Sequence, residues 1–432
     1  MHKTQTLNNA IFEHCNQSID NALFAERYPS WKRSCPELKD IDFVHLGILR
    51  CISQVDSGRH FLQTAEEIYG EQVPHSTYFK SLKSTRRTSM LEAVELQSYE
   101  HHCATLSSQG IDYLASFPEL NEYIVLAADG HFIDHASHTE KCKNGKVYAA
   151  GFIYSLNLRY GLLRSFCLVT NGTRRHQEIP ALRNQLEKQN RTKSPAQKCI
   201  YVYDKAVTDY AFWDRQVSDG NFMISVLKEN SVATFVQPIP FDTAHKINTG
   251  VESYSLYENN DIRFSVINYR DPETGKLHRF VSTLPHSINP GTISMLYYKR
   301  WTIEKTFNNN KSDLKEVKAW SSNNNSLKNQ MRLTAMSYNQ LRVFEEISKI
   351  QDSALIHPSD KKYTQSLKKR QQASEKKGGF VNQLFFQKRI VRISSYTIRA
   401  VQNAIITGKS LVSLMDDLVA RLVPRVHLIG EH

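Results

Sequence analysis

The feature that most constrains the fold is a continuous apolar run at residues 123–128, Tyr-Ile-Val-Leu-Ala-Ala, which ends at Asp129-Gly130. A run of this kind suits a strand that is buried on both faces. Other strand candidates lie at residues 146–158, 162–170, 199–203 and 222–227, with helices expected at about 176–190 and 208–217. This order predicts an α/β core in which strands come first and then alternate with helices.

The composition sets broad bounds on the class of protein. The chain has 432 residues, enough for two or three domains, and 40% of them are hydrophobic. Its 55 Lys and Arg residues against 43 Asp and Glu residues give a net charge of +12, which favours polyanionic partners. The seven cysteines are scattered singly, without a Cys-x-x-Cys pair, so we expect no zinc site and reduced thiols in a cytosolic compartment. The N-terminus lacks an apolar leader and no run approaches about 18 apolar residues, so we expect no membrane span.

The strand and helix order is interrupted at residues 231–290. Strand patterns at 262–269 and 278–284 flank the turn-rich sequence Asp271-Pro-Glu-Thr-Gly275 and predict a hairpin. Helical patterns resume at about residue 292, run past Lys311, and return at about 326–348. These patterns predict a helical region at 1–115, a core at 120–230 and 291–348, a β-rich insertion at 231–290 and a basic helical C-terminal region at 349–432.

The N-terminal region has helical patterns at 41–52 and 61–69, followed by a break at Gly70-Glu-Gln-Val-Pro-His. Ser76 can cap a new helix near 77–87. That helix has no acidic residue and four basic ones, Lys80, Lys83, Arg86 and Arg87. A short helix, a turn and a basic helix near 60–87 are the parts of a helix-turn-helix DNA reader. A solvated basic helix in a small bundle is the alternative.

Basic residues also gather near the C-terminus. Residues 361–392 contain ten Lys and Arg residues and a single acid, Glu375. A basic arm that touches the DNA backbone and a solvated linker are both compatible with this pattern.

One predicted helical face carries an aromatic hydroxyl, a guanidinium, a carboxylate and an ammonium. Tyr297, Arg300, Glu304 and Lys311 are separated by three, four and seven residues. At about 3.6 residues per turn these offsets align the four side chains in one row. A carboxylate flanked by cations can hold a metal ion while its neighbours bind phosphate. The row therefore indicates phosphoryl-transfer chemistry on a nucleic acid.

Two more acids stand in comparable positions, because Asp129 and Asp204 each follow an apolar strand pattern. Ligands of α/β folds bind at the sheet's rim, where strand ends expose their side chains. Three carboxylates gathered there repel one another unless a divalent cation neutralises them. Oxygen ligands favour Mg²⁺ or Mn²⁺, and a pair of such ions can activate an attacking water or 3′-hydroxyl.

Each acid also has a purely structural interpretation. A strand-end Asp is often a turn or cap residue. Asp134 and Asp209 lie close enough in sequence to compete for the same metal role. Glu304 could instead pair with Lys305 or Arg300 on a solvated face. The residues alone leave these alternatives open.

The row at 297–311 resembles, without gaps, the Tyr-Arg-Glu-Lys motif of the bacterial DDE-class transposases typified by insertion sequence four. The flanking sequences Phe280-Val-Ser-Thr-Leu-Pro and Lys299-Arg-Trp-Thr-Ile-Glu-Lys-Thr-Phe agree with it. Val125-Leu-Ala-Ala-Asp129-Gly and Tyr201-Val-Tyr-Asp204-Lys-Ala are similar to the strands that carry that family's two aspartates. The resemblance covers residues 120–345, about half of the chain.

The resemblance implies a ribonuclease-H-like catalytic core, interrupted by a β-rich insertion and preceded by a DNA-binding region. Asp129, Asp204 and Glu304 would be the catalytic residues and the ligands of Mg²⁺ or Mn²⁺, with two ions expected.

The resemblance also implies how DNA is bound. Tyr297, Arg300 and Lys311 would contact phosphates near the transposon end. Terminal inverted repeats and target DNA would be the substrates, a homodimer the active form, and the bacterial cytoplasm at the nucleoid the location.

Some relatives stack a flipped base on a tryptophan of the insertion when they form a DNA hairpin. Residues 231–290 contain no Trp, so stacking would fall to Tyr254, Tyr257 or Tyr269.

Taken with the resemblance, the sequence predicts a cut-and-paste DNA transposase. A domesticated DNA-binding protein without catalysis and a host nuclease are the alternatives, and the intact acid set argues against the first of them.

Overall fold

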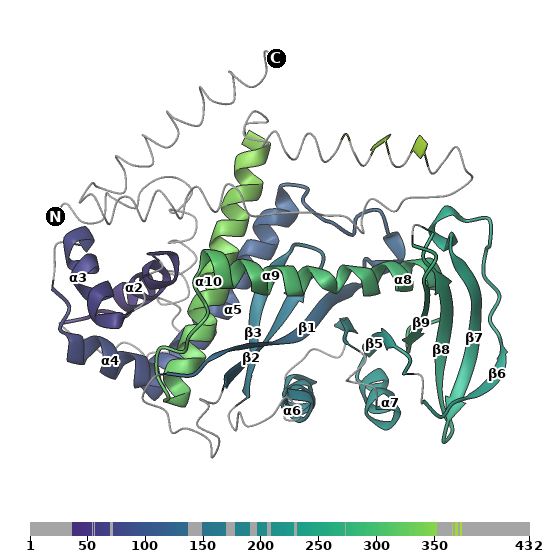
Figure 1. Ribbon diagram of the computed structural model, residues 1–432, viewed down its shortest axis with the longest axis horizontal. Helices are drawn as coiled ribbons and strands as arrows, with labels where there is room; N and C mark the ends of the chain where they lie inside the picture. The colour runs from purple at the N-terminus through teal and green to yellow at the C-terminus, as the bar shows by residue number, and fades with distance from the viewer. Residues whose placement is uncertain are drawn as a thin grey trace, which may run out of the picture.

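The computed structural model of the chain is shown in Figure 1. The residues that it describes are 37–53, 55, 57–69, 72–136, 149–169, 178–190, 197–204, 209–228, 231–272 and 274–351, with isolated residues at 365, 368, 369, 372 and 373. Apart from these isolated positions, the predicted basic segment at 361–392 lies outside the described residues.

One nine-stranded sheet runs through the described part of the chain, in the order β3-β2-β1-β4-β5-β9-β8-β7-β6. Its strands are β1 (Tyr123–Asp134), β2 (Ala149–Asn157), β3 (Leu162–Val169), β4 (Lys198–Val202), β5 (Asn221–Val226), β6 (Thr234–Pro238), β7 (Val251–Asn259), β8 (Ile262–Arg270) and β9 (Leu277–Ser282). Strand β4 pairs in parallel with both β1 and β5, and the other neighbours are antiparallel. The predicted mixed α/β core is confirmed.

Helices cover both faces of this sheet. They are α2 (Asp40–Ser53), α3 (Gly58–Tyr69), α4 (His75–Lys83), α5 (Thr85–Ser108), α6 (Glu178–Asn190), α7 (Tyr210–Ser218), α8 (Pro290–Lys299), α9 (Trp301–Asp313) and α10 (Asn324–Gln351). Helices α8 and α9 run end to end across one side of the strands and meet α10, while α6 and α7 lie on the other side (Figure 1). Among the described residues, no helix is long and apolar enough to cross a membrane.

The central strand β1 explains the continuous apolar run, because it packs on both faces. Val125 and Ala127 belong to the core under α8, α9 and α10. Ala128, with Ile124 and Leu126 beside it, packs in the second core with α6 and α7. Side chains alternate along a strand, so a strand covered on both faces must be apolar at every position.

Residues 231–290 extend the sheet rather than forming a separate one, since β9 pairs with β5. The predicted hairpin is confirmed as β8 and β9. The β7–β8 hairpin was not predicted, although its turn carries a signal. Asn260 and Asp261 both have positive φ, 46° and 65°, which a two-residue hairpin turn of this type requires and which Asn and Asp tolerate.

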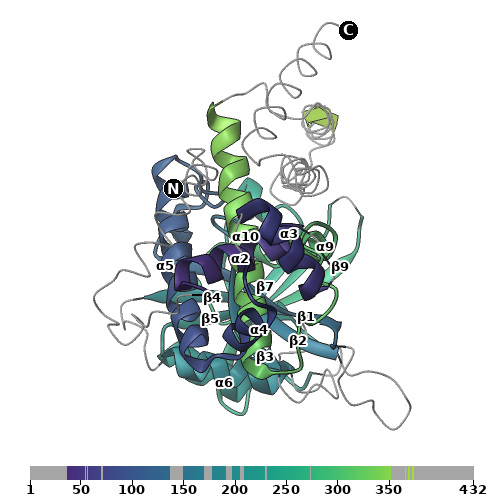
Figure 2. The same ribbon diagram turned by 90° about the vertical axis from the view of Figure 1, so that its left-hand side faces the viewer.

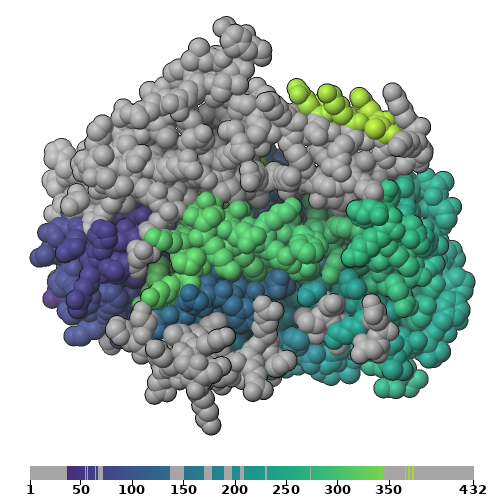
Figure 3. Space-filling model, viewed as in Figure 1, coloured from purple at the N-terminus to yellow at the C-terminus, as the bar shows by residue number. Residues whose placement is uncertain are grey.

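The N-terminal helices pack against α10, with α2 and α4 lying along it in the view turned by 90° (Figure 2). Buried polar contacts join the two parts: Asn329 donates to the Leu82 carbonyl at 2.9 Å, and Arg332 donates to the Thr88 carbonyl at 2.7 Å. The space-filling view shows α9 and α10 as a band between these helices and the β-rich segment (Figure 3). The helical N-terminal elements are therefore docked on the core.

The predicted helix at 77–87 is in fact two helices, and its predicted cap is wrong. Helix α4 begins at His75 after Pro74 without a side-chain cap, and it ends at Lys83. Ser84 has extended backbone and its hydroxyl accepts a hydrogen bond from the Arg87 backbone N–H, so Ser84 caps the next helix, α5. Pro74 stands at the N-cap, so the helix starts at His75 and Ser76 already lies inside it, where its side chain cannot act as the cap.

This correction can be tested by replacing the two serines. Ser84→Ala should lower the free energy of unfolding by about 1 kcal/mol, because the first turn of α5 loses its cap. Ser76→Ala, at an exposed position inside α4, should change it by less than about 0.5 kcal/mol. Urea unfolding of both variants measures the difference, and a larger loss in Ser76→Ala would contradict the assignment.

Candidate active site

Two aspartates are brought together by the register of parallel strands. Ala127 of β1 lies opposite Val202 of β4. Asp129 comes two residues after Ala127, and Asp204 comes two residues after Val202. Since side chains alternate, both carboxylates lie on the face that Ala127 and Val202 share, which α8, α9 and α10 cover.

The sequence predicted that Asp129 ends its strand, and this prediction is wrong. Strand β1 continues to Asp134 because β2 pairs with it along that whole stretch. The other neighbour, β4, ends at Val202, two residues before Asp204. Asp129 therefore lies where β1 loses one neighbour and its side chain reaches the rim of the parallel pair.

Glu304 approaches the same place from helix α9, and Arg300 lies between it and Asp129. One guanidinium nitrogen of Arg300 is 3.3 Å from Asp129 Oδ2, and another is 2.8 Å from Glu304 Oε1. The Arg300 side chain is only 5% exposed, against 24% for Asp129 and 35% for Glu304. The pairing of Glu304 with Arg300, one of the structural alternatives, is thus present in the structure.

The three acids also interact electrostatically. Burial is the largest cause that raises the pKa of Asp129, and Glu304 and Asp204 add to the increase, while Arg300 lowers it. Among the described residues, no three acidic, histidine or cysteine side chains are already close enough to hold a metal ion. Arg300 supplies the positive charge that these carboxylates need.

Two competing aspartates have other roles. Asp209 caps α7 by accepting from the Phe212 backbone N–H at 3.0 Å, and it pairs with Arg183 at 2.7 Å. Asp134 is exposed at the end of β1, five residues beyond Asp129, and its backbone bridges to Lys318. Because side chains alternate along β1, Asp134 lies on the opposite face from Asp129. The geometry therefore favours Asp129 and Asp204.

The predicted row of four side chains spans two helices. Helix α8 ends at Lys299 and α9 begins at Trp301, but Arg300 keeps helical backbone angles (φ −51°, ψ −37°). Tyr297 is buried against Phe280, with ring centroids 4.9 Å apart, and Lys311 is exposed two turns beyond Glu304. The helical spacing of the four side chains continues across the junction of α8 and α9, because the backbone of Arg300 is helical.

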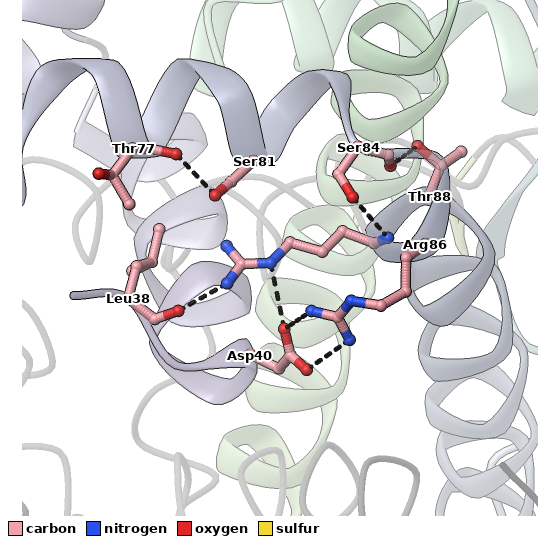
Figure 4. Close-up of polar contacts among 8 residues, drawn as sticks. Leu38, Asp40, Thr77, Ser81, Ser84, Arg86 and Thr88 are labelled. Atoms are coloured by element: carbon pink, nitrogen blue, oxygen red, sulfur yellow. Dashed lines mark hydrogen bonds and ion pairs between the residues drawn. The ribbon is translucent and has the colours of Figure 1, made fainter. Parts of the chain in front are cut away.

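The basic residues near the N-terminus divide into two kinds. Arg86 forms a two-pronged ion pair with Asp40, at 2.8 and 2.6 Å (Figure 4). Arg87 is buried, with its guanidinium 3.1 Å from Asp40 and donating to the Leu38 carbonyl. These contacts join α5 to the start of α2 and engage both guanidinium groups within the protein; contact of Arg86 and Arg87 with DNA stays a prediction. Lys80 and Lys83 are exposed on α4.

The aromatic residues also differ from expectation. Tyr254 and Tyr269 are 2% and 3% exposed, so neither offers a free face to a base. Tyr257 is half-buried and packs edge-on against Phe235. Trp301, which was not among the predicted site residues, is 52% exposed and has the Arg300 guanidinium over its ring at 5.4 Å. The position of Trp301 directly after Arg300 was the sequence signal that could have identified it as a candidate site residue.

Lys299, beside Arg300, makes a prediction about pH possible. The side chain is 5% exposed, burial lowers its pKa to about 8, and Asp112 partly opposes this shift. Between pH 8 and 10.5 the unfolded chain binds more protons at this residue than the folded one, so wild-type stability should rise with pH. Relative to Lys299→Met, the gain should be roughly 1–3 kcal/mol in urea unfolding between pH 7 and 10. The exposed Lys305→Met is the control, and a pH-independent difference for Lys299→Met would refute the claim.

Comparison with known proteins agrees with this geometry. A model of the family described as transposase DDE domain matches residues 119–340, just over half of the chain. The matched range holds β1, β4, α9 and the acids Asp129, Asp204 and Glu304. A search among curated proteins found no match.

Proposed function

The chain belongs to the transposase DDE domain family, and from this premise we propose that it is a cut-and-paste DNA transposase of the insertion-sequence-four type. The observation that supports the proposal is that Arg300 bridges Asp129 and Glu304 at one rim of the sheet, while the register of β1 and β4 brings Asp204 near enough to influence the charge of Asp129. The proposed substrates are the terminal inverted repeats of its own element and a target DNA.

The proposed reaction has two displacements at phosphorus. In the first, water attacks the phosphodiester at the element's end, the P–O3′ bond breaks, and a 3′-hydroxyl is freed. In the second, that hydroxyl attacks a target phosphodiester, and the target's own 3′ oxygen leaves. Each displacement forms one P–O bond and breaks one, so no covalent enzyme intermediate is required.

The side chains at the rim suit a divalent cation. Asp129, Asp204 and Glu304 present only carboxylate oxygens, the ligands that Mg²⁺ and Mn²⁺ prefer. Burial is the main cause of the raised pKa of Asp129, and repulsion from Glu304 and Asp204 adds to it; a bound cation would relieve that repulsion. One or two such ions would lower the pKa of the attacking water and stabilise the leaving oxygen.

Arg300 has a double role in this proposal. Without DNA it neutralises Asp129 and Glu304, at 3.3 and 2.8 Å. A scissile phosphate offers a guanidinium a competing two-pronged partner. We therefore propose that Arg300 moves from the carboxylates to the DNA backbone when the transposon end binds, while its neighbour Trp301 offers an aromatic face to a displaced base.

Other contacts would position the DNA. Lys311, exposed on α9, would contact a phosphate near the cleaved end, and Tyr297 would support Arg300 from its buried position. Lys80 and Lys83 of α4 would contact the backbone of the terminal repeat. A homodimer, with the N-terminal helices bound to repeat DNA, is the proposed synaptic form.

The carboxylate assignment is tested by exchanging acids for amides. Glu304→Gln should reduce cleavage of DNA that carries the flanking repeats by at least about 100-fold, since even outer-shell metal partners are worth 10–100-fold. Binding of that DNA should remain within about threefold of wild type, because Glu304 makes no favourable contact with phosphate in this account.

Matched controls are available in the same elements. Asp313→Asn alters another acid of α9, and Asp134→Asn alters the competing acid of β1. Both should cleave at nearly the wild-type rate, whereas Asp129→Asn and Asp204→Asn should not. Loss of DNA binding in Glu304→Gln, or strong cleavage by it, would refute the assignment. Repeat binding without cleavage by the wild type would favour a catalytically silent DNA-binding protein.

A further inference from the structure

A buried carboxylate lies behind the active site, in the connector between α9 and α10. Glu316 is 2% exposed. Its Oε1 accepts from the Tyr154 hydroxyl at 2.6 Å, and its Oε2 lies 3.2 Å from His131 Nε2 and 3.4 Å from Asn310 Nδ2. Isolated buried carboxylates are costly, so these three partners are what make the position tolerable.

The partners come from three different elements. His131 is on β1, Tyr154 on β2 and Asn310 on α9, and all three are at most 2% exposed. One carboxylate therefore ties the last turn of α9 to two adjacent strands. Burial and the charge of Glu316 together raise the pKa of Tyr154 well above its usual value, which keeps its hydroxyl protonated as a donor.

A turn in the backbone of the connector between α9 and α10 directs the Glu316 side chain into the core. Lys315 has a φ of +51°, a left-handed conformation unusual for a side chain of this kind. The turn lets the Glu316 backbone N–H donate to the Asn310 carbonyl at 3.0 Å. Just beyond, Asp134 of β1 exchanges backbone hydrogen bonds with Val317 and Ala319, at 2.9 and 2.7 Å. Strain of this kind is retained where the surroundings fix it.

This cluster lies directly next to the proposed catalytic acids. His131 is two residues beyond Asp129 on the same face of β1. Phe307, one turn after Glu304 on α9, packs on His131 and Tyr154 with ring centroids 4.9 and 5.8 Å away. Any shift of α9 along β1 would therefore break contacts of Glu316 and change the separation of Asp129 and Glu304.

We propose that Glu316 is a positioning residue that fixes the spacing between Asp129 and Glu304 by clamping α9 to β1 and β2. The role rests on the proposed function, because that function gives the spacing its purpose. Glu316 touches neither DNA nor metal in this account; it acts through Phe307 and His131.

The test compares three variants of the full chain, Glu316→Gln, Tyr154→Phe and Leu186→Ala. The first two weaken the clamp with little change in shape. Leu186→Ala is the control, because Leu186 is fully buried on α6 in the core of the opposite face and should cost stability without touching the clamp. Mn²⁺ affinity is measured by titration under electron paramagnetic resonance, on protein bound to a duplex of its flanking repeat. Thermal unfolding and repeat affinity are measured in parallel.

We expect the Mn²⁺ dissociation constant to rise about tenfold in Glu316→Gln and by a smaller factor in Tyr154→Phe, as for other outer-shell partners. Repeat affinity should change less than about twofold, and Leu186→Ala should lower the unfolding temperature without changing Mn²⁺ affinity. If Glu316→Gln does not fold, Tyr154→Phe alone decides.

Unchanged Mn²⁺ affinity in the clamp variants, or an equal change in Leu186→Ala, would overturn the positioning role while leaving the proposed function in place. Absence of Mn²⁺ binding by the wild type would overturn the proposed function and this role with it.

Discussion

The parallel pairing of β1 with β4 is the constraint on which the rest of the structure depends. Parallel strands are covered by helices on both faces, so both sides of each strand are buried. The apolar run before Asp129 provides the apolar side chains that both cores need. The same register, Ala127 opposite Val202, carries Asp129 and Asp204 to one rim and one face. A slip by one residue would turn one of the two carboxylates to the opposite face.

Arg300 is the second element on which the site depends. Arg300 is 4% exposed, so its guanidinium loses most of its hydration, and its ion pairs with Asp129 and Glu304 recover part of that cost. Such an arrangement adds little to stability, and well-packed apolar side chains of similar size would often serve the fold equally well. A buried charge at the rim is thus better explained by function than by stability.

The sequence predicted the elements well and their junctions poorly. Strands and helices of the core were predictable because apolar periodicity reports burial directly, as in β1, α6 and the β8–β9 hairpin. The start of α4 and the cap at Ser84 were not, because Ser76 offers the same local chemistry as Ser84 and only the position of Pro74 distinguishes them. The ion pairs of Arg86 and Arg87 were not predictable either, because their partner, Asp40, lies more than 40 residues away in sequence.

The candidate site was predictable to a similar extent. The three acids and the arginine were identified from spacing and resemblance, yet the pairing of Arg300 with Asp129 depends on how α9 crosses β1, which no local pattern encodes. Glu316 was missed for the same reason: a lone Glu in a connector looks solvated until tertiary packing buries it among His131, Tyr154 and Asn310. Burial of a charged residue is a property of the whole fold.

The most direct test of the central claim is a crystal structure of the protein with repeat DNA and Mn²⁺, with the anomalous signal of the metal recorded. We expect anomalous density ligated by Asp129, Asp204 and Glu304, with the Arg300 guanidinium turned from the carboxylates to a DNA phosphate. Metal density elsewhere, with Arg300 still bridging Asp129 and Glu304 in a complex that cleaves DNA, would contradict the claim.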